Sequence, residues 1–103
     1  MTKGYVVFTE AIHDQEALDA YTGAATPTVL AAGARPLIIG PPAEVTEGEW
    51  HGDVTVILEF ESLDAAVAWY RSDEYQAVIP QRHAAADSNV AIFSGFDFGD
   101  VAE

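Results

Sequence analysis

The sequence predicts an α+β fold in which one antiparallel sheet carries two helical segments on one of its faces. Three observations lead to this prediction. The chain has 103 residues, the length of a single domain. Hydrophobic residues make up 50% of it, which is enough to bury a core. Apolar residues recur with the spacings of strands and helices in the order strand, helix, strand, strand, helix, strand.

The first half of the chain supplies two strands and one helix. An apolar run from Gly4 to Glu10 predicts the first strand. Asp14 is a suitable N-cap for a helix that continues to a glycine stop at Gly33. Because Pro27 lacks an amide hydrogen and disfavours helical geometry in the residue before it, we expect a kink or a restart there. Residues Arg35 to Gly40 predict the second strand.

The second half begins with a polar connection, residues Ala43 to Asp53. The segment from Asp53 to Glu61 alternates between two sets of side chains, one of them apolar, and predicts the third strand. The region from Ser62 to Ala86 has helical spacing, with a break at Ser72 and Asp73 and a second short helix after it. Residues Asn89 to Ser94 predict the last strand.

This element order predicts the ferredoxin-like βαββαβ arrangement, with both helical segments on one sheet face. Residues 1–95 would form this domain, and residues 96–103 a short acidic tail. The strands carry apolar residues on both faces, as Ile57 does opposite Val56 and Leu58. Since the helices cover one face only, we expect a second copy to cover the other, giving a homodimer through the sheet face.

The charge balance excludes several partners. There are 17 acidic residues and a formal net charge of −13. Only four basic residues oppose them, which are Lys3, Arg35, Arg71 and Arg82. Nucleic acids and anionic membrane surfaces bind through clustered basic side chains, so we expect neither partner. The acidity indicates a well-solvated surface, and adaptation to a salty cytoplasm is the alternative explanation.

The sequence also indicates where the protein works and what it lacks. No window is apolar enough for a membrane span and the start of the chain has no apolar signal region, so we expect a cytoplasmic protein. With no cysteine there is no thiol nucleophile and no thiolate metal site. The histidines lack metal-ligand spacing, and no phosphate-binding glycine loop is present. We therefore expect neither a metal nor a cofactor.

Three residues are the candidate catalytic groups: Tyr75, Arg82 and His83. At helical spacing Tyr75 and His83 lie near one line and Arg82 on a neighbouring one, so the three side chains would border one cleft. His83 would move a proton, and Arg82 would hold a carboxylate or an enolate. The alternative is structural: Tyr75 packs, Arg82 pairs with an acid, and His83 is exposed near a helix end.

Trp69 and Tyr70 are the candidate ligand-binding residues. Their large rings suit a flat aromatic ligand, and they lie close in sequence to the candidate catalytic groups. Packing is the alternative for both residues. Tyr70 continues the apolar stripe of Ala66 and Val67, whereas Trp69 lies one step off it.

The chain resembles the domain of unknown function 1330 family over about residues 3 to 95. The residues that carry the resemblance are Lys3-Gly4-Tyr5, Tyr21 followed by Pro27, Gly33, Glu47-Gly48, and Trp69-Tyr70 with Ser72-Asp73-Glu74-Tyr75-Gln76. The resemblance implies a dimeric α/β barrel, in which two ferredoxin-like sheets face each other. Ala34 and Gly40-Pro41 depart from the family pattern, which affects only the local loop geometry.

Two functions remain open at this stage. The first is a cofactor-independent enzyme of oxygenase or isomerase type that acts on a small aromatic or carboxylated metabolite. The alternative is a non-catalytic module that binds a small ligand or serves as an accessory protein. Catalysis requires two or more polar groups to converge on one ligand, so the geometry of the site distinguishes the two.

Overall fold

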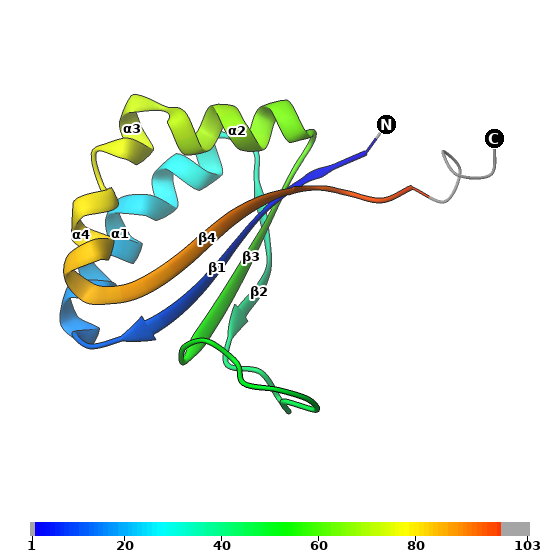
Figure 1. Cartoon of the computed structure of the whole chain (residues 1–103). Helices are drawn as coiled ribbons and strands as arrows, with labels where there is room; N and C mark the ends of the chain where they lie inside the picture. Colours follow the sequence, from blue (N-terminus) through cyan, green and yellow to red (C-terminus); the bar gives the residue numbers. More distant parts are fainter. Residues whose placement is uncertain (1, 98–103) are drawn as a thin grey trace.

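The computed structural model describes residues 2–97 and contains one four-stranded antiparallel sheet with the strand order β2-β3-β1-β4 (Figure 1). The strands are β1 (Gly4–Ile12), β2 (Arg35–Gly40), β3 (Val54–Phe60) and β4 (Ala86–Ser94). The helices pack on one face of this sheet. The predicted α+β, ferredoxin-like fold class is therefore confirmed. The predicted acidic tail falls largely in residues 98–103, which lie outside the described residues.

The first helix, α1 (Gln15–Ala31), begins where the sequence indicated. The Asp14 side chain accepts a hydrogen bond from the Ala17 amide at 3.0 Å. The helix passes through Pro27, so of the two expected outcomes, a kink or a restart, the restart does not occur. Pro27 is exposed, and its ring faces solvent rather than the sheet. The helix ends before Gly33, whose φ of 71° suits a glycine.

The second helical region consists of three short helices, which are α2 (Leu63–Arg71), α3 (Asp73–Gln76) and α4 (Ile79–Ala85). Ser72 separates the first two because its backbone is extended. Its hydroxyl donates a hydrogen bond to the Trp69 carbonyl at 2.7 Å and accepts one from the Tyr75 amide at 3.2 Å. A further break before Ile79 places Tyr75 and Arg82 on different helices. The predicted single helix after the break at Ser72 was therefore wrong.

The alternation of side chains along β1 defines the two faces of the sheet. Val6, Phe8 and Glu10 are buried beneath the helices. Tyr5 and Val7 lie on the other face, here called the open face. The register pairs Val6 with Leu58 and Phe8 with Val56, so the same alternation continues through β3. β4 begins at Ala86, three residues before the predicted start.

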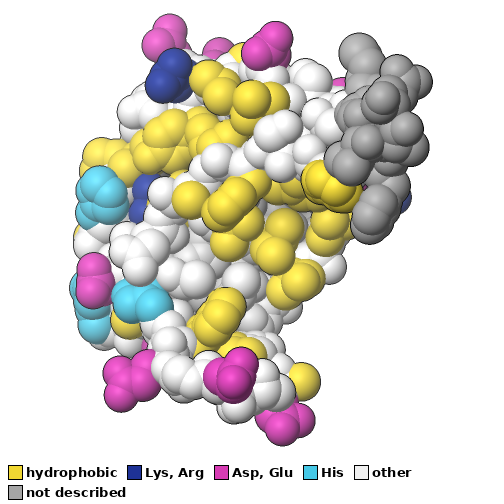
Figure 2. Space-filling view, turned by 45° about the vertical axis from the view of Figure 1, so that its right-hand side comes forward, with side chains coloured by type: hydrophobic (Ala, Val, Ile, Leu, Met, Phe, Trp, Pro, Cys, Tyr) yellow, Lys and Arg dark blue, Asp and Glu magenta, His cyan; other side chains and the backbone are white. Residues whose placement is uncertain are grey.

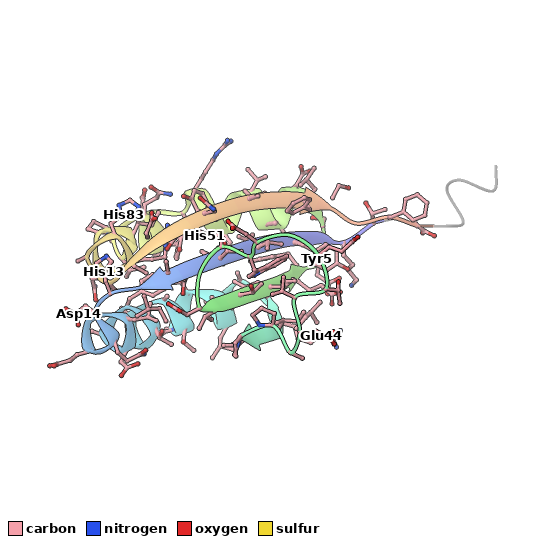
Figure 3. The ribbon with its side chains drawn as sticks, turned by 60° about the horizontal axis from the view of Figure 1, so that its bottom comes forward. Tyr5, His13, Asp14, Glu44, His51 and His83 are labelled. Carbon is pink, nitrogen blue, oxygen red and sulfur yellow. The ribbon has the colours of Figure 1, made fainter. Side chains whose placement is uncertain are left out.

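The loop of residues 41–53 folds over one end of the open face, where Figure 3 shows His51 lying across the strands. The Trp50 indole N–H donates a hydrogen bond to the Thr55 hydroxyl at 3.0 Å. His51 Nδ1 and the Thr9 hydroxyl oxygen are 2.8 Å apart. The Asp53 amide donates to the Glu10 carbonyl at 2.7 Å. These contacts tie the loop to β1 and β3.

The part of the open face that this loop leaves uncovered carries apolar side chains. Phe93 is 53% exposed and Ile38 is 49% exposed. In Figure 2, hydrophobic side chains gather across the middle of the face shown, with acidic side chains at its lower end. None of the helices within residues 2–97 is both long enough and apolar enough to cross a membrane.

Gly52 allows the loop to approach β1 closely, and its replacement tests this contact. Gly52 has a φ of 85°, and a Cβ atom there would overlap the backbone of Glu10. We expect Gly52→Ala to lower the free energy of unfolding by about 3 kcal/mol in urea titrations. Gly48→Ala is the matched control, because Gly48 also has a positive φ but open space around it. It should cost about 1 kcal/mol. Equal losses would contradict the close contact.

Candidate functional site

A cavity of about 140 Å³ lies between α1 and the sheet. Phe8, Val56 and Leu58 form its floor, and Ala25 and Val29 of α1 form its roof. Nearly all of its lining is apolar. A cavity of this size accommodates a molecule with about one aromatic ring.

The cavity opens beside the edge strand β2. Leu30 and Ile39 line it and are 65% and 69% exposed, so they mark its mouth. Trp69 lines it as well and is buried. The cavity therefore connects the solvent at the sheet edge with the interior of the domain.

Glu10 places a carboxyl group in this apolar cavity. It is the third helix-facing position of β1, after Val6 and Phe8, and is only 4% exposed. Burial raises the pKa of the Glu10 carboxyl, and the positive charge of Arg82 partly offsets this effect. A carboxyl whose pKa is raised toward neutrality suits proton transfer.

Two buried tyrosines form the second polar group of the site. Tyr21 lines the cavity from α1, and its hydroxyl lies 2.7 Å from the hydroxyl of Tyr75. Burial raises the pKa of both hydroxyls, so both remain protonated at neutral pH. Of the two, only Tyr21 lines the cavity, so Tyr21 is the member of the pair that an occupant could contact.

Arg82 brings a positive charge to the interior behind these tyrosines. It is 2% exposed, and its guanidinium carbon lies 5.6 Å from the centre of the Phe8 ring. Its charge favours a negative charge on Glu10 and on the tyrosine oxygens. Its Nε is buried and finds no hydrogen-bond partner among residues 2–97. A buried charge that is incompletely hydrogen-bonded is costly and often marks a functional site.

The structure places the predicted ligand-binding residues differently. Trp69 lines the cavity, where its indole N–H donates to the Thr28 hydroxyl at 3.0 Å. Its ring centre lies 4.0 Å from that of Tyr75. Tyr70 is half-buried and packs on both of these rings, with its centre 5.5 Å from that of Tyr75. Trp69 thus lies where a ligand would contact it, and Tyr70 supports it from outside the cavity lining.

The predicted cleft shared by Tyr75, Arg82 and His83 is not formed. Tyr75 and Arg82 are buried together, but His83 is exposed on α4, and Figure 3 shows it at the edge of the molecule. The prediction assumed one helix through all three residues. Because α3 ends at Gln76, the spacing of four residues no longer aligns His83 with Tyr75. Consecutive residues of a helix also point in different directions, which separates His83 from Arg82.

The sequence interpretation missed Glu10 and Tyr21. Glu10 had a detectable signal, because it continues the alternate positions of Val6 and Phe8, where an apolar residue is expected. Tyr21 lies on the apolar stripe of α1, where an aromatic residue indicates packing alone. Its approach to Tyr75 depends on tertiary structure.

The site as a whole can bind a small apolar molecule and exchange a proton with it. Glu10 supplies a proton acceptor, and Tyr21 supplies a donor for an oxygen atom. No group of three or more acidic or histidine side chains within residues 2–97 is arranged to hold a metal ion.

Comparison with known proteins identifies the family. The domain of unknown function (DUF1330) matches residues 3–96, and this chain belongs to that family. The resemblance noted from the sequence is confirmed. None of the curated proteins matches the chain.

Several solved structures share the fold. One is a protein of unknown function from Rhodopseudomonas palustris, with 20% identity over 93% of this chain and 84% of that one and a TM-score of 0.76. Another is a cofactor-independent oxygenase from Streptomyces nogalater, with 10% identity over 94% and 96% of the two chains and a TM-score of 0.69. A third, from Thermobifida fusca, is a dimeric ferredoxin-like protein of unknown function. It has 12% identity over 90% and 91% and a TM-score of 0.58.

The pH dependence of stability tests the burial of Glu10. Its folded pKa lies above its unfolded value, so below about pH 4 both states hold the proton and burial of a charge costs nothing. As the pH rises through the unfolded and then the folded pKa, only the native state must bury a carboxylate, and stability falls. We expect Glu10→Gln to increase the free energy of unfolding at about pH 8 and to leave it unchanged below about pH 4.

Urea titrations at the two pH values measure this difference. Glu47→Gln in the exposed loop controls for the loss of one negative charge from an acidic protein. If Glu10→Gln destabilised the protein more at the higher pH, the attraction of Arg82 would outweigh the cost of burial.

Proposed function

We propose that this protein is a cofactor-independent enzyme that binds a compact, largely apolar metabolite in the cavity and removes a proton from it. Glu10 accepts the proton, Tyr21 contacts an oxygen of the substrate, and Trp69 packs against the substrate ring. Proton removal is the first step of both an isomerase reaction and a cofactor-independent oxygenation, so both types remain within this proposal.

The observation that carries the proposal is the convergence of Glu10 and Tyr21 on one apolar cavity. A carboxyl group is rarely placed in such surroundings without a role, because its burial is costly. The apolar lining of the cavity also lowers the local dielectric constant, which strengthens hydrogen bonds to a substrate. The oxygenase from Streptomyces nogalater supports the proposal only through its shared fold.

The non-catalytic alternative is a module that binds the same kind of molecule. The nearly complete apolar lining of the cavity favours it, since apolar contact alone is enough for binding. Under this alternative Glu10 selects the ligand and transfers no proton. Proton exchange in a bound molecule distinguishes the two functions.

We also propose that the protein is a homodimer through the open face. Tyr5, Val7 and Ile57 lie there beside the exposed Phe93, and a second copy would remove this apolar surface from water. The structural neighbour from Thermobifida fusca is described as dimeric, which is consistent with this arrangement. The cavity lies on the helix-covered face, so each subunit would retain its own.

Hydrogen exchange in 2-indanone, a compact aromatic ketone, tests the enzyme proposal. We expect the protein to accelerate exchange of the carbon-bound hydrogens for solvent deuterium, followed by proton NMR. Glu10→Gln should reduce the acceleration by about 10²-fold, the usual contribution of a general base. Ala25→Leu fills the cavity and should abolish both binding and exchange.

Ala20→Leu is the matched control, because Ala20 is exposed on α1 and lies outside the cavity lining. It should retain full exchange. Binding that Ala25→Leu blocks, without any exchange in the wild-type protein, would favour the non-catalytic module.

The dimer has its own test. We expect Phe93→Glu to weaken self-association by at least about tenfold, because a charge would be buried at the centre of the interface. Sedimentation velocity over a concentration series measures the change. Leu63→Glu is the control, since Leu63 is an exposed apolar residue on α2, away from the open face. Equal effects of the two variants would refute this interface.

A further inference from the structure

Resting on the proposed function, we infer that Tyr21, Tyr75 and Arg82 form a relay that stabilises an oxyanion in the cavity. The substrates are therefore small cyclic ketones, enols or phenols, whose oxygen becomes negative when Glu10 takes their proton. Tyr21 contacts that oxygen, and Tyr75 and Arg82 are positioning residues that act through it.

The arrangement of the three groups carries this inference. Tyr21 lines the cavity, and its hydroxyl lies 2.7 Å from the hydroxyl of Tyr75, a residue that is absent from the lining. The charge of Arg82 acts on both tyrosine oxygens. The hydrogen bond between the two tyrosines polarises both hydroxyls, and the buried cation of Arg82, over the ring of Phe8, strengthens that polarisation. The positive charge of Arg82 thus acts on Tyr21 in the cavity lining, although Arg82 itself is absent from the lining.

The charges also balance during the proposed step. Before the reaction the buried groups are the Glu10 carboxylate and the Arg82 guanidinium. The substrate C–H or O–H bond breaks, its proton moves to Glu10, and the electron pair remains on the substrate as an enolate or a phenolate. One negative charge has then moved from Glu10 to the substrate. The net charge of the site is unchanged, so no additional charge has to be buried.

A carboxylic acid substrate fits this site poorly. It would carry its negative charge into the cavity before any proton is moved, next to Glu10. Two carboxylates in one apolar site repel each other. The relay therefore favours substrates that enter neutral and become anionic only after binding.

The test uses 4-nitrophenol, whose colour reports its ionisation, and nitrobenzene, which has no ionisable oxygen. Both are matched to the size of the cavity. Just below the pH at which the free phenol ionises, we expect binding to produce the phenolate spectrum. Tyr21→Phe should reduce the affinity for the phenolate by about tenfold, and Tyr75→Phe by about threefold. Both variants should lose less affinity for nitrobenzene than for the phenolate, and a circular dichroism spectrum like that of the wild-type protein shows that they are folded.

Tyr5→Phe is the matched control, because Tyr5 bonds to Glu59 on the open face, away from the cavity. It should leave both ligands unaffected. If nitrobenzene binds but nitrophenol stays neutral, or if Tyr75→Phe behaves like Tyr5→Phe, the relay is refuted while the binding function stands. If neither compound binds, the proposed function and the relay both fail.

Discussion

The packing of Trp69 against its aromatic neighbours holds the helical layer on the sheet. Its ring centre lies 5.4 Å from that of Phe60 in β3 and 4.0 Å from that of Tyr75 in α3. Each buried aromatic ring removes a large apolar area from water, and aromatic pairs add further stabilisation. Ser72 complements this packing, because it bonds to both Trp69 and Tyr75 and so fixes the turn between α2 and α3. The chain then continues into α4, which packs against α1 and β4.

The path of the chain into α4 brings the positive charge of Arg82 into the interior. α4 packs against α1 and β4, and from it Arg82 lies over the ring of Phe8 in β1 and near Glu10. Replacing such buried charges with apolar residues often stabilises a protein, so stability alone gives little reason to keep them. Glu10 lines an apolar cavity and Arg82 lies near Glu10, and this position gives a better reason to keep both charges. A fixed charge in a dry site acts on a bound molecule more strongly than it would in water.

The sheet has a second face that the helices leave uncovered. Helices cover one of its faces, and the loop of residues 41–53 covers one end of the other through Trp50 and His51. The remaining apolar surface is the one proposed to pair with a second copy. Figure 2 shows acidic side chains at its lower end rather than across its middle. The loop is also bonded to the backbone of Glu10, which connects the open face to the cavity through one strand.

The sequence by itself determined the order of the elements, their approximate ends and the fold class. These features depend on local periodicity and capping, such as the alternation along β3 and the caps at Asp14 and Ser62, which neighbouring residues decide. The restart that was one of the two expectations at Pro27 does not occur, and the proline lies on the exposed side of α1. Of the candidate site residues, Tyr75 and Arg82 come together as buried neighbours, but His83 does not join them. Only the tertiary structure decided this, since a break of two residues between α3 and α4 changes the direction of every later side chain. The same holds for Tyr21 and Glu10, which meet their partners across large sequence separations that no local pattern encodes.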